Sequence, residues 1–367
     1  MIPVYKPYIT ERLIKFGESA IRSGWISSNG MYVDFATDKL KRFIDSDYVL
    51  LTSNGTVANH LMIKCLHKFY PQVKRIAVPN NVYVSVWNSL LYDNFDYEFV
   101  PIDASLSSWN MSTRHLLEKQ KEFDAIYVTH NLGNVINVYR LKEMFPDKII
   151  FEDACEAFGG YYNSNHAGTE SVFSTFSFFG NKNITCGEGG AFVTKYKEIY
   201  DYARKIFGQG QTEKKFIHDE LGYNYRLNNV SASMLYAQIE DYPEIAHKKD
   251  IVFSRYRKLL RKNPKVRFQI EVVNTKHSNW MFGIRIRGNS NYDDAYRFFK
   301  DRNIETRPLF YPVSYHKHLQ EKFKGKEDSA KLLNKEVIIL PSYPELTYSQ
   351  QEYIAEVVEE FSKNVKI

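Results

Sequence analysis

Short apolar runs alternate with longer amphipathic stretches over roughly the first half of the chain. Seven of these runs have the length and composition of strands: 48–53, 75–80, 97–103, 125–130, 148–153, 172–178 and 191–194. The earlier runs are separated by enough residues for a crossover helix, which parallel strands require. The pattern therefore predicts an α/β fold with a large domain built on a mostly parallel seven-stranded sheet, covered by helices on both faces. The last two runs flank a glycine-rich turn, and there we expect the parallel order to break.

The pattern changes near residue 245. Residues 10–23 and 229–241 are predicted to be helical, and a charged helical stretch follows at 245–261. Two strands are then expected at 266–272 and 280–286, and a last helix opens at Ser349, with Glu352 completing a capping box. We therefore expect a large domain at 1–245, including the N-terminal helix, and a smaller C-terminal α+β domain at 246–367.

Composition narrows the class of protein. Apolar residues make up 44% of the 367 residues and charged residues 25%, which is typical of a globular protein. No apolar run approaches the roughly 18 residues of a membrane span, and residues 1–7 lack the basic-then-apolar pattern of an export signal, so we expect a cytoplasmic protein. The net charge of +6 is spread along the chain, which does not favour nucleic-acid binding. The three cysteines show no metal-ligand spacing, so no metal site is expected.

Polar residues end several of the predicted strands, where sheets of this kind bind their ligands. Lys182 follows the run 172–178 across a short turn, and Asp153 ends the run before it. A lysine and a carboxylate at the ends of neighbouring buried strands are what a pyridoxal phosphate enzyme needs. The lysine bonds to the cofactor aldehyde, and the carboxylate keeps the pyridine nitrogen protonated. The alternatives are a surface lysine and an aspartate that only caps a helix.

Two further features fit a flat, phosphorylated cofactor. Gly55 and Thr56 lie where a strand gives way to a helix, and the backbone N–H groups at such a helix start attract anions. Tyr83 follows the strand at 75–80 and has a ring that can stack on the cofactor. Ordinary turn chemistry and core packing are the respective alternatives.

Taken together, these motifs resemble the DegT/DnrJ/EryC1/StrS family of pyridoxal phosphate-dependent sugar aminotransferases over nearly the whole chain. The similar segments are 23–27, 53–58, 152–159, 177–182, 187–190 and 222–226. The resemblance implies the aspartate-aminotransferase-like fold, which is fold type I of pyridoxal phosphate enzymes.

The resemblance also implies roles for individual residues. Lys182 would be the covalent anchor of the cofactor and the general base, and Asp153 would bind the pyridine nitrogen. The remaining cofactor contacts would come from Glu156 at the ring hydroxyl, Tyr83 on the ring face, and Gly55, Thr56 and Ser177 at the phosphate. Asn224 would reach the phosphate in a partner subunit, which implies a homodimer with shared active sites.

Related dehydratases have a histidine in place of this lysine, so Lys182 favours transamination. The segments around Lys182 look most like viosamine and perosamine synthases, which use L-glutamate to aminate C4 of nucleotide-linked 4-keto-6-deoxy sugars. We expect a UDP or dTDP carrier first and GDP next. The candidates for the sugar-nucleotide pocket are Trp25, Ser27, Asn29, His130, Arg307 and His316. A sugar 3-aminotransferase, a 3-dehydratase and a non-catalytic regulator with this fold stay open as alternatives.

Overall fold

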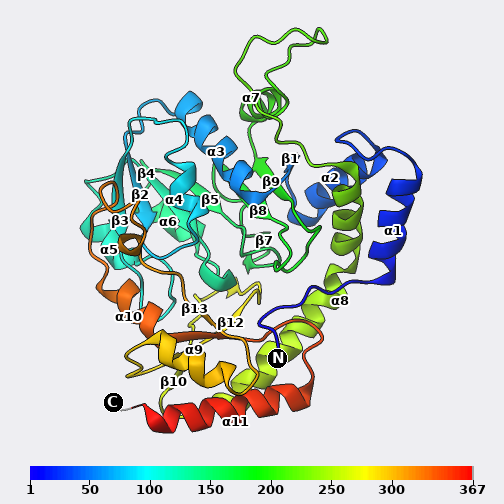
Figure 1. The fold of residues 1–367 in the computed structure, drawn as a ribbon. Helices are drawn as coiled ribbons and strands as arrows, with labels where there is room; N and C mark the ends of the chain where they lie inside the picture. The colour runs from blue at the N-terminus through cyan, green and yellow to red at the C-terminus, as the bar shows by residue number, and fades with distance from the viewer. Residues whose placement is uncertain (366–367) are drawn as a thin grey trace.

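A seven-stranded sheet forms the centre of the protein in the computed structural model, which describes residues 1–365 (Figure 1). Its strands lie in the order β1-β9-β8-β5-β4-β2-β3. Their bounds are β1 Tyr48–Thr52, β2 Arg75–Pro79, β3 Glu98–Ile102, β4 Ala125–Thr129, β5 Ile149–Asp153, β8 Phe173–Ser177 and β9 Gly190–Thr194. All seven predicted strands are present, and the mostly parallel order is confirmed. Strand β9 runs antiparallel to both β1 and β8, where the order was expected to break.

Helices cover both faces of this sheet because successive side chains of each strand point to opposite sides. Leu50 and Phe192 face a core shared with α3 (Gly55–Phe69) and α7 (Lys197–Phe207). Val49, Leu51 and Val193 face a core shared with α2 (Met31–Ile44) and α8 (Asn229–Leu260). The helices of this half are α1 Glu11–Arg22, α2 Met31–Ile44, α3 Gly55–Phe69, α4 Ser85–Ser89, α5 Thr113–Glu118, the 3-10 turn η1 Asn131–Gly133, α6 Val138–Met144 and α7 Lys197–Phe207.

The long helix α8 (Asn229–Leu260) connects the two halves of the molecule (Figure 1). Sequence reading divides this region into two helical stretches around Pro243, but the structure joins them into one. Proline removes one intrahelical hydrogen bond, yet Tyr242 and Ile245 on either side of it are buried in the core. Packing against α1, α2 and α11 therefore outweighs the cost of the proline. The domain boundary expected near residue 245 lies inside α8, and the division into two domains stays a prediction.

The C-terminal half is built around a four-stranded antiparallel sheet in the order β10-β12-β14-β13. Its elements are β10 Val266–Phe268, β12 Phe282–Ile286, α9 Tyr292–Lys300, β13 Arg307–Pro308, η2 Val313–Tyr315, α10 Asp328–Glu336, β14 Val337–Leu340 and α11 Tyr348–Asn364. A small sheet pairs β11 (Thr275–Lys276) with β6 (Tyr161–Tyr162), and β6 with β7 (Asn165–His166). Strand β10 ends well before the predicted residue 272.

The last helix begins slightly earlier than the sequence indicates. The capping box is formed by Thr347 and Gln350, not by Ser349 and Glu352. The Gln350 N–H donates to Thr347 Oγ1, and the Thr347 N–H donates to Gln350 Oε1. Both pairs have the same spacing, so the sequence alone does not separate the two registers.

The first residues of the chain lie against the C-terminal half. Ile2 forms a β-bridge with Ile304, and the Val4 N–H donates to Glu305 Oε2 at 2.9 Å. The Tyr5 hydroxyl then donates to the backbone oxygen of Lys182 at 2.7 Å. The N-terminal segment thus links the C-terminal half to the turn that carries Lys182. In residues 1–365, no helix is both long and apolar enough to cross a membrane.

Candidate active site

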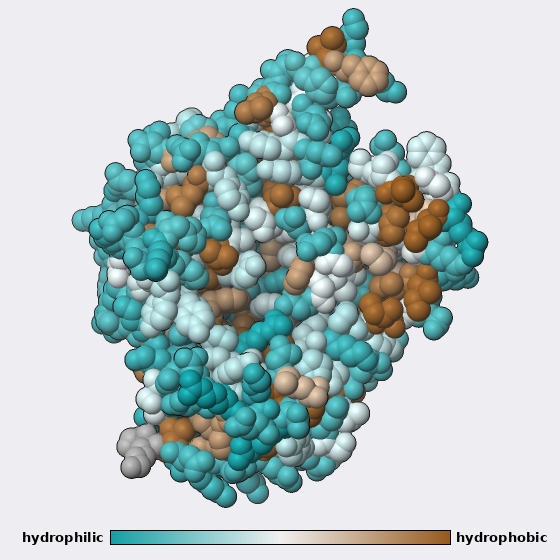
Figure 2. Space-filling model, in the orientation of Figure 1, coloured by the Kyte–Doolittle hydropathy of each residue, from teal (hydrophilic) through white to brown (hydrophobic). Residues whose placement is uncertain are grey.

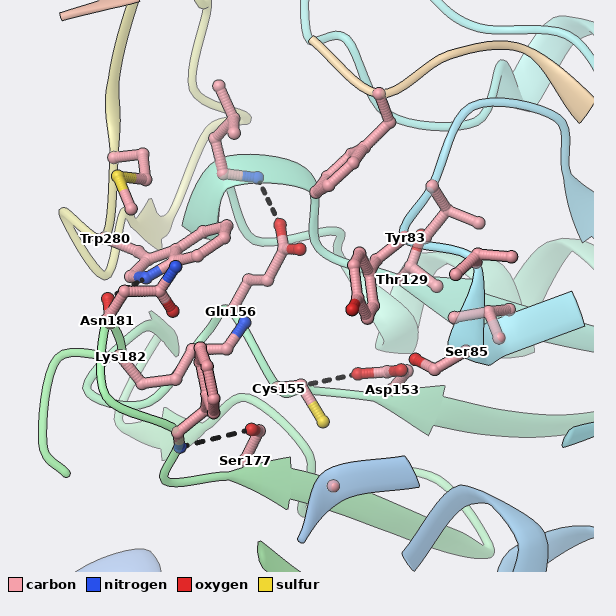
Figure 3. A pocket seen from close by; sticks show the side chains of 18 of the residues that line it. Tyr83, Ser85, Thr129, Asp153, Cys155, Glu156, Ser177, Asn181, Lys182 and Trp280 are labelled. Carbon is pink, nitrogen blue, oxygen red and sulfur yellow. Dashed lines mark hydrogen bonds between the residues drawn. The ribbon is translucent and has the colours of Figure 1, made fainter. Parts of the chain in front are cut away.

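A cavity of about 880 Å³ lies at the carboxyl edge of the large sheet, with the C-terminal half forming its other wall. This is the edge at which parallel sheets bind ligands, and its size is typical of a cofactor or small-ligand site. Ten of the predicted site residues line it: Gly55, Thr56, Tyr83, His130, Asp153, Glu156, Ser177, Lys182, Arg307 and His316. Residues far apart in the sequence are thus brought together around one space (Figure 3).

Asp153 ends β5 and is 7% exposed. Its Oδ2 accepts a hydrogen bond from the Asn59 side chain at 2.8 Å, and its Oδ1 accepts from the Cys155 N–H at 2.9 Å. Both partners are neutral, although a buried carboxylate is stabilised best by a cation. A protonated pyridine nitrogen is a partner of the required charge. The carboxylate does more than cap a turn, because Asn59 fixes its second oxygen in the cavity wall.

Lys182 lies in the turn after β8, which is the parallel neighbour of β5. Its side chain is half-buried and lines the cavity. The Nζ atom lies 3.9 Å from the centre of the Trp280 ring. The same indole donates from Nε1 to the backbone oxygen of Asn181 at 2.7 Å. Trp280 and Tyr5 therefore hold the turn from outside the large sheet, and leave the amine at the cavity surface.

The start of α3 forms a cradle for an anion. The Asn54 side chain accepts from the Val57 N–H at 3.0 Å, and the N–H groups of Gly55 and Thr56 before it have no intrahelical partner because they lie at the helix start. Gly55 and Thr56 bring these groups to the cavity. A Cβ atom at Gly55 would lie 2.8 Å from Cβ of Ser177, so only glycine permits this close approach. The geometry fits a phosphate held between the helix start and Ser177.

Glu156 lies deep in the cavity wall, between the rings of Trp280 and Tyr83 in the view of Figure 3. Its Oε2 accepts the Leu132 N–H at 2.8 Å. Burial raises the pKa of this carboxyl to about 7, although the positive charge of Lys182 opposes the shift. A carboxyl of this kind can hold or release a proton near neutral pH, which suits a partner for a ring hydroxyl.

His130 lines the cavity, but both of its ring nitrogens are bound by the protein. The Ile136 N–H donates to Nδ1 at 3.0 Å, so this nitrogen carries no proton. Nε2 must then donate to Glu152 Oε2 at 3.0 Å. Burial opposes ionisation of Glu152, but this bond and others to Ser171 and Gly168 hold its pKa below the ordinary value. The side chain of His130 is fully buried, so it offers no free polar atom to a ligand.

Aromatic and basic side chains form the rim of the cavity. Tyr83 is 57% exposed, and its ring lies 6.2 Å from that of Phe310. Arg307 begins β13, and its guanidinium lies 3.6 Å from Glu305. The His316 ring lies 5.4 Å from that of Trp87, and burial lowers its pKa. The rim thus offers flat surfaces and a positive charge to a ligand.

Four predicted site residues do not line this cavity. Trp25, Ser27 and Asn29 lie in the exposed loop between α1 and α2, where the Trp25 carbonyl accepts from Asn229 at 2.7 Å. Asn224 is exposed, and its Oδ1 accepts from the Arg226 guanidinium at 3.0 and 3.1 Å. Their assigned roles would require a second subunit and stay predictions.

Sequence reasoning missed three residues of this site. Asn59 orients Asp153, Trp280 contacts Lys182, and Asn181 precedes the lysine with a buried Oδ1 that has no partner. Asn59 is a polar residue on a helix face that is otherwise buried and apolar, which is a signal that could have found it. Trp280 gave no such signal, because an aromatic residue in an apolar run is normally interpreted as a residue of the hydrophobic core.

The donor set fits pyridoxal phosphate. A half-buried lysine, a buried carboxylate with only neutral partners, a helix-start cradle and an exposed aromatic ring surround one cavity. Over residues 1–365, no group of three or more histidine, cysteine or acidic side chains is arranged to hold a metal ion.

Comparisons with known proteins agree with this fit. Residues 7–359 match the DegT/DnrJ/EryC1/StrS aminotransferase family. The chain is 34% identical to GDP-perosamine synthase of Escherichia coli O157:H7, covering 98% of each chain. It is 31% identical to GDP-perosamine synthase of Vibrio cholerae, covering 98% of this chain and 99% of the other.

A solved structure shares the fold with a TM-score of 0.90. It is that of the dehydratase ColD, GDP-4-keto-6-deoxymannose-3-dehydratase, with bound GDP-perosamine. It is 22% identical, and 98% of this chain and 100% of ColD are covered. The chain therefore belongs to the DegT/DnrJ/EryC1/StrS aminotransferase family, the pyridoxal phosphate-dependent sugar aminotransferases.

Proposed function

We propose that the protein transfers the amino group of L-glutamate to C4 of a nucleotide-linked 4-keto-6-deoxyhexose, giving a 4-amino-4,6-dideoxy sugar. The observation that carries the proposal is the placement of Lys182 and Asp153 at the ends of adjacent strands in one cavity with an anion cradle. The family supplies the reaction class, and the relatives named as perosamine synthases supply the sugar class.

When bound, pyridoxal phosphate supplies an electron sink that makes a proton on the adjacent carbon acidic. Lys182 would hold the cofactor covalently and, once released, would move that proton between carbons. Asp153 would keep the pyridine nitrogen protonated, and Asn59 would keep the carboxylate in place. Gly55 and Ser177 would bind the phosphate, while Tyr83 would cover one face of the ring and exclude water there.

Lysine at position 182 also separates amine transfer from dehydration. In the dehydratases that this chain resembles, a histidine takes the place of the lysine, so no amine is available for covalent attachment. The fold does not distinguish the two reactions, since ColD is a dehydratase and superimposes closely. The side chain at this one position is thus the main support for transamination over 3-dehydration.

The relatives change the order of the candidate nucleotides. The sequence alone favours a UDP or dTDP carrier, whereas two relatives that are 34% and 31% identical are named GDP-perosamine synthases. We therefore place a GDP-linked 4-keto-6-deoxy sugar first among the substrates to be tested, and UDP and dTDP sugars next.

A homodimer with shared active sites is part of the proposal. Apolar side chains are exposed on α1, on α2 and between them: Ile14, Ile21, Trp25, Ile26, Met31 and Phe35. Figure 2 shows brown residues gathered over this region, on the right of the molecule. The segment 208–222 projects beyond α7 (Figure 1), and its Phe216 is 85% exposed. A second subunit covering these surfaces would explain both the apolar exposure and the distance of Asn224 from its own cavity.

A two-step spectroscopic experiment tests the proposed reaction. L-Glutamate is added to the holoenzyme, and conversion of the aldehyde cofactor to its amine form is followed by absorbance together with release of 2-oxoglutarate. The GDP-, UDP- and dTDP-linked 4-keto-6-deoxy sugars are then added separately, and we expect the GDP sugar to restore the aldehyde form fastest. An enzyme that accepts glutamate but is not restored by any of the three would contradict the sugar assignment.

A further inference from the structure

The indole of Trp280 is the nearest aromatic surface to the amine of Lys182. The Nζ atom lies 3.9 Å from the ring centre, well within the roughly 6 Å over which a cation is attracted to an aromatic face. Trp280 is 6% exposed, so this contact is shielded from water on the far side of the ring. A shielded contact of this kind attracts the ammonium form of lysine more strongly than the neutral amine.

The indole cannot easily move away from the lysine. Its Nε1 donates to the backbone oxygen of Asn181, the residue directly before Lys182. The backbone oxygen of Trp280 accepts from the Lys249 Nζ at 2.8 Å. This fully buried amine also donates to the backbone oxygen of Ser342. Trp280 is therefore fixed at both ends, to the catalytic turn and to α8.

Other charged groups also face the amine. Asp153 ends β5 and Glu156 lies in the loop after it, Glu188 lines the cavity beyond the turn, and Arg307 lies in the opposite wall. The charge of Lys182 lowers the pKa of Glu156, against the larger opposite effect of burial. None of these groups forms an ion pair with Lys182 within 4 Å in residues 1–365, so the indole is its direct partner.

Transamination places a specific demand on this lysine. In each half of the reaction the amine takes a proton from one carbon and gives it to another, and it is an ammonium in between. The ammonium must stay close to both carbons without bonding to either. A surface that attracts the cation but offers it no strong, directional acceptor meets this demand.

We propose that Trp280 is a positioning residue that holds the protonated Lys182 amine on its indole face whenever the amine is not bonded to the cofactor. This inference rests on the proposed function for its purpose, but the contact itself can be tested without substrate. Weakening the attraction would release the amine from the ring, where electrophiles that enter the cavity would reach it more readily.

The test uses the full-length protein freed of cofactor. Trp280 is replaced site-specifically by tryptophans carrying increasing numbers of fluorine atoms, which keep the N–H and the shape but weaken the attraction for a cation. The labelling rate of Lys182 by trinitrobenzenesulfonate at about pH 8 is measured by peptide mass spectrometry. We expect the rate to rise progressively along the series, by about fivefold at the most fluorinated ring. Rates that stay constant along the series would overturn the proposal.

Two variants separate charge from structure. Tyr353→Phe removes a hydroxyl that donates to the Arg302 carbonyl outside the cavity, so labelling of Lys182 should match the unaltered protein. Trp280→Leu loses both the ring and the hydrogen bond to Asn181, and should label fastest. If Trp280→Leu accelerates labelling while the fluorinated series does not, the role of Trp280 is only structural and the proposal is wrong. The labelling rate could rise with fluorination in a protein that is inactive on every sugar tested. That result would contradict the proposed function but would support this inference.

Discussion

The side-chain amide of Asn59 donates to Asp153 Oδ2 at 2.8 Å, from the second turn of the helix whose first residues form the anion cradle. The Asn59 oxygen in turn accepts from the Thr175 hydroxyl of β8. One helix therefore fixes both ends of the cofactor site. Its N-terminus would bind the phosphate, and its second turn orients the carboxylate that would meet the pyridine nitrogen.

Replacement of Asn59 tests this coupling. In Asn59→Leu, Asp153 keeps only the Cys155 N–H as a partner, and the Thr175 hydroxyl loses its acceptor. We expect cofactor affinity, measured by absorbance titration of the cofactor-free protein, to fall about tenfold. Thr175→Val is the matched control, because it removes the second bond and leaves the first. Equal affinity in Asn59→Leu and the unaltered protein would show that Asp153 needs no positioning.

Lys182→Ala tests the assignment of the anchor and general base. The cavity keeps its phosphate cradle and Asp153, so cofactor should still bind, whereas turnover should fall by at least about a thousandfold. Borohydride treatment of the unaltered holoenzyme should leave the cofactor attached to the denatured chain, and the variant should lose it. Turnover close to that of the unaltered enzyme in Lys182→Ala would rule out this mechanism.

Gly55→Ala tests the phosphate cradle. The added Cβ would lie 2.8 Å from Cβ of Ser177 and 3.2 Å from the Cys155 sulfur, so the helix start and the strand must separate. We expect cofactor affinity to fall about tenfold or more, with the fold retained by circular dichroism. Gly17→Ala in α1 is the control, since its Cβ would meet only Met234 at 3.9 Å. A loss of affinity that is equal in both variants would mean that the cradle is not the cause.

Stability should decrease in mild acid because His166 is buried as a neutral ring. Its Nε2 accepts the Gly159 N–H at 2.8 Å, and burial lowers its pKa to about 4. Between about pH 6.5 and pH 4 the unfolded chain binds a proton at this histidine and the folded chain does not, so the free energy of unfolding falls as pH falls. The loss from about pH 7 to pH 5 due to this residue should be about 2 kcal/mol.

Denaturant unfolding at several pH values checks this expectation. His166→Gln should be less stable than the unaltered protein near neutral pH, but should lose less stability on acidification. The exposed His247, replaced in the same way, is the matched control. Identical pH dependence in His166→Gln and the unaltered protein would contradict the neutral assignment.

The sequence predicts the large sheet well because its signals are local. Each strand is a short apolar run with its own boundaries, and the residues that end the strands, such as Asp153 and Ser177, converge at one edge by the geometry of parallel sheets. The continuous α8 was not predicted, since a proline normally ends a helix and only the tertiary packing around Tyr242 and Ile245 overrides it.

Contacts between distant segments also escape a reading of the sequence. Tyr5 and Trp280 both meet the Lys182 turn, yet they come from the N-terminal segment and the C-terminal half. No sequence motif next to either residue marks it as part of the site. Each is an aromatic residue of the kind that usually packs in a core. His130 shows the converse case, because it lines the cavity as a predicted sugar contact, but its two ring nitrogens are bound by the protein.

The position of the new amine on the sugar tests the central claim most directly. The holoenzyme is incubated with ¹⁵N-labelled L-glutamate and GDP-4-keto-6-deoxymannose, with the UDP- and dTDP-linked 4-keto-6-deoxy sugars in parallel. The product is then analysed by NMR for coupling of the nitrogen to sugar carbons. The account predicts that the label is bonded to C4 and that the C3 hydroxyl is retained. A label at C3, or loss of the C3 hydroxyl with no nitrogen in the product, would contradict it.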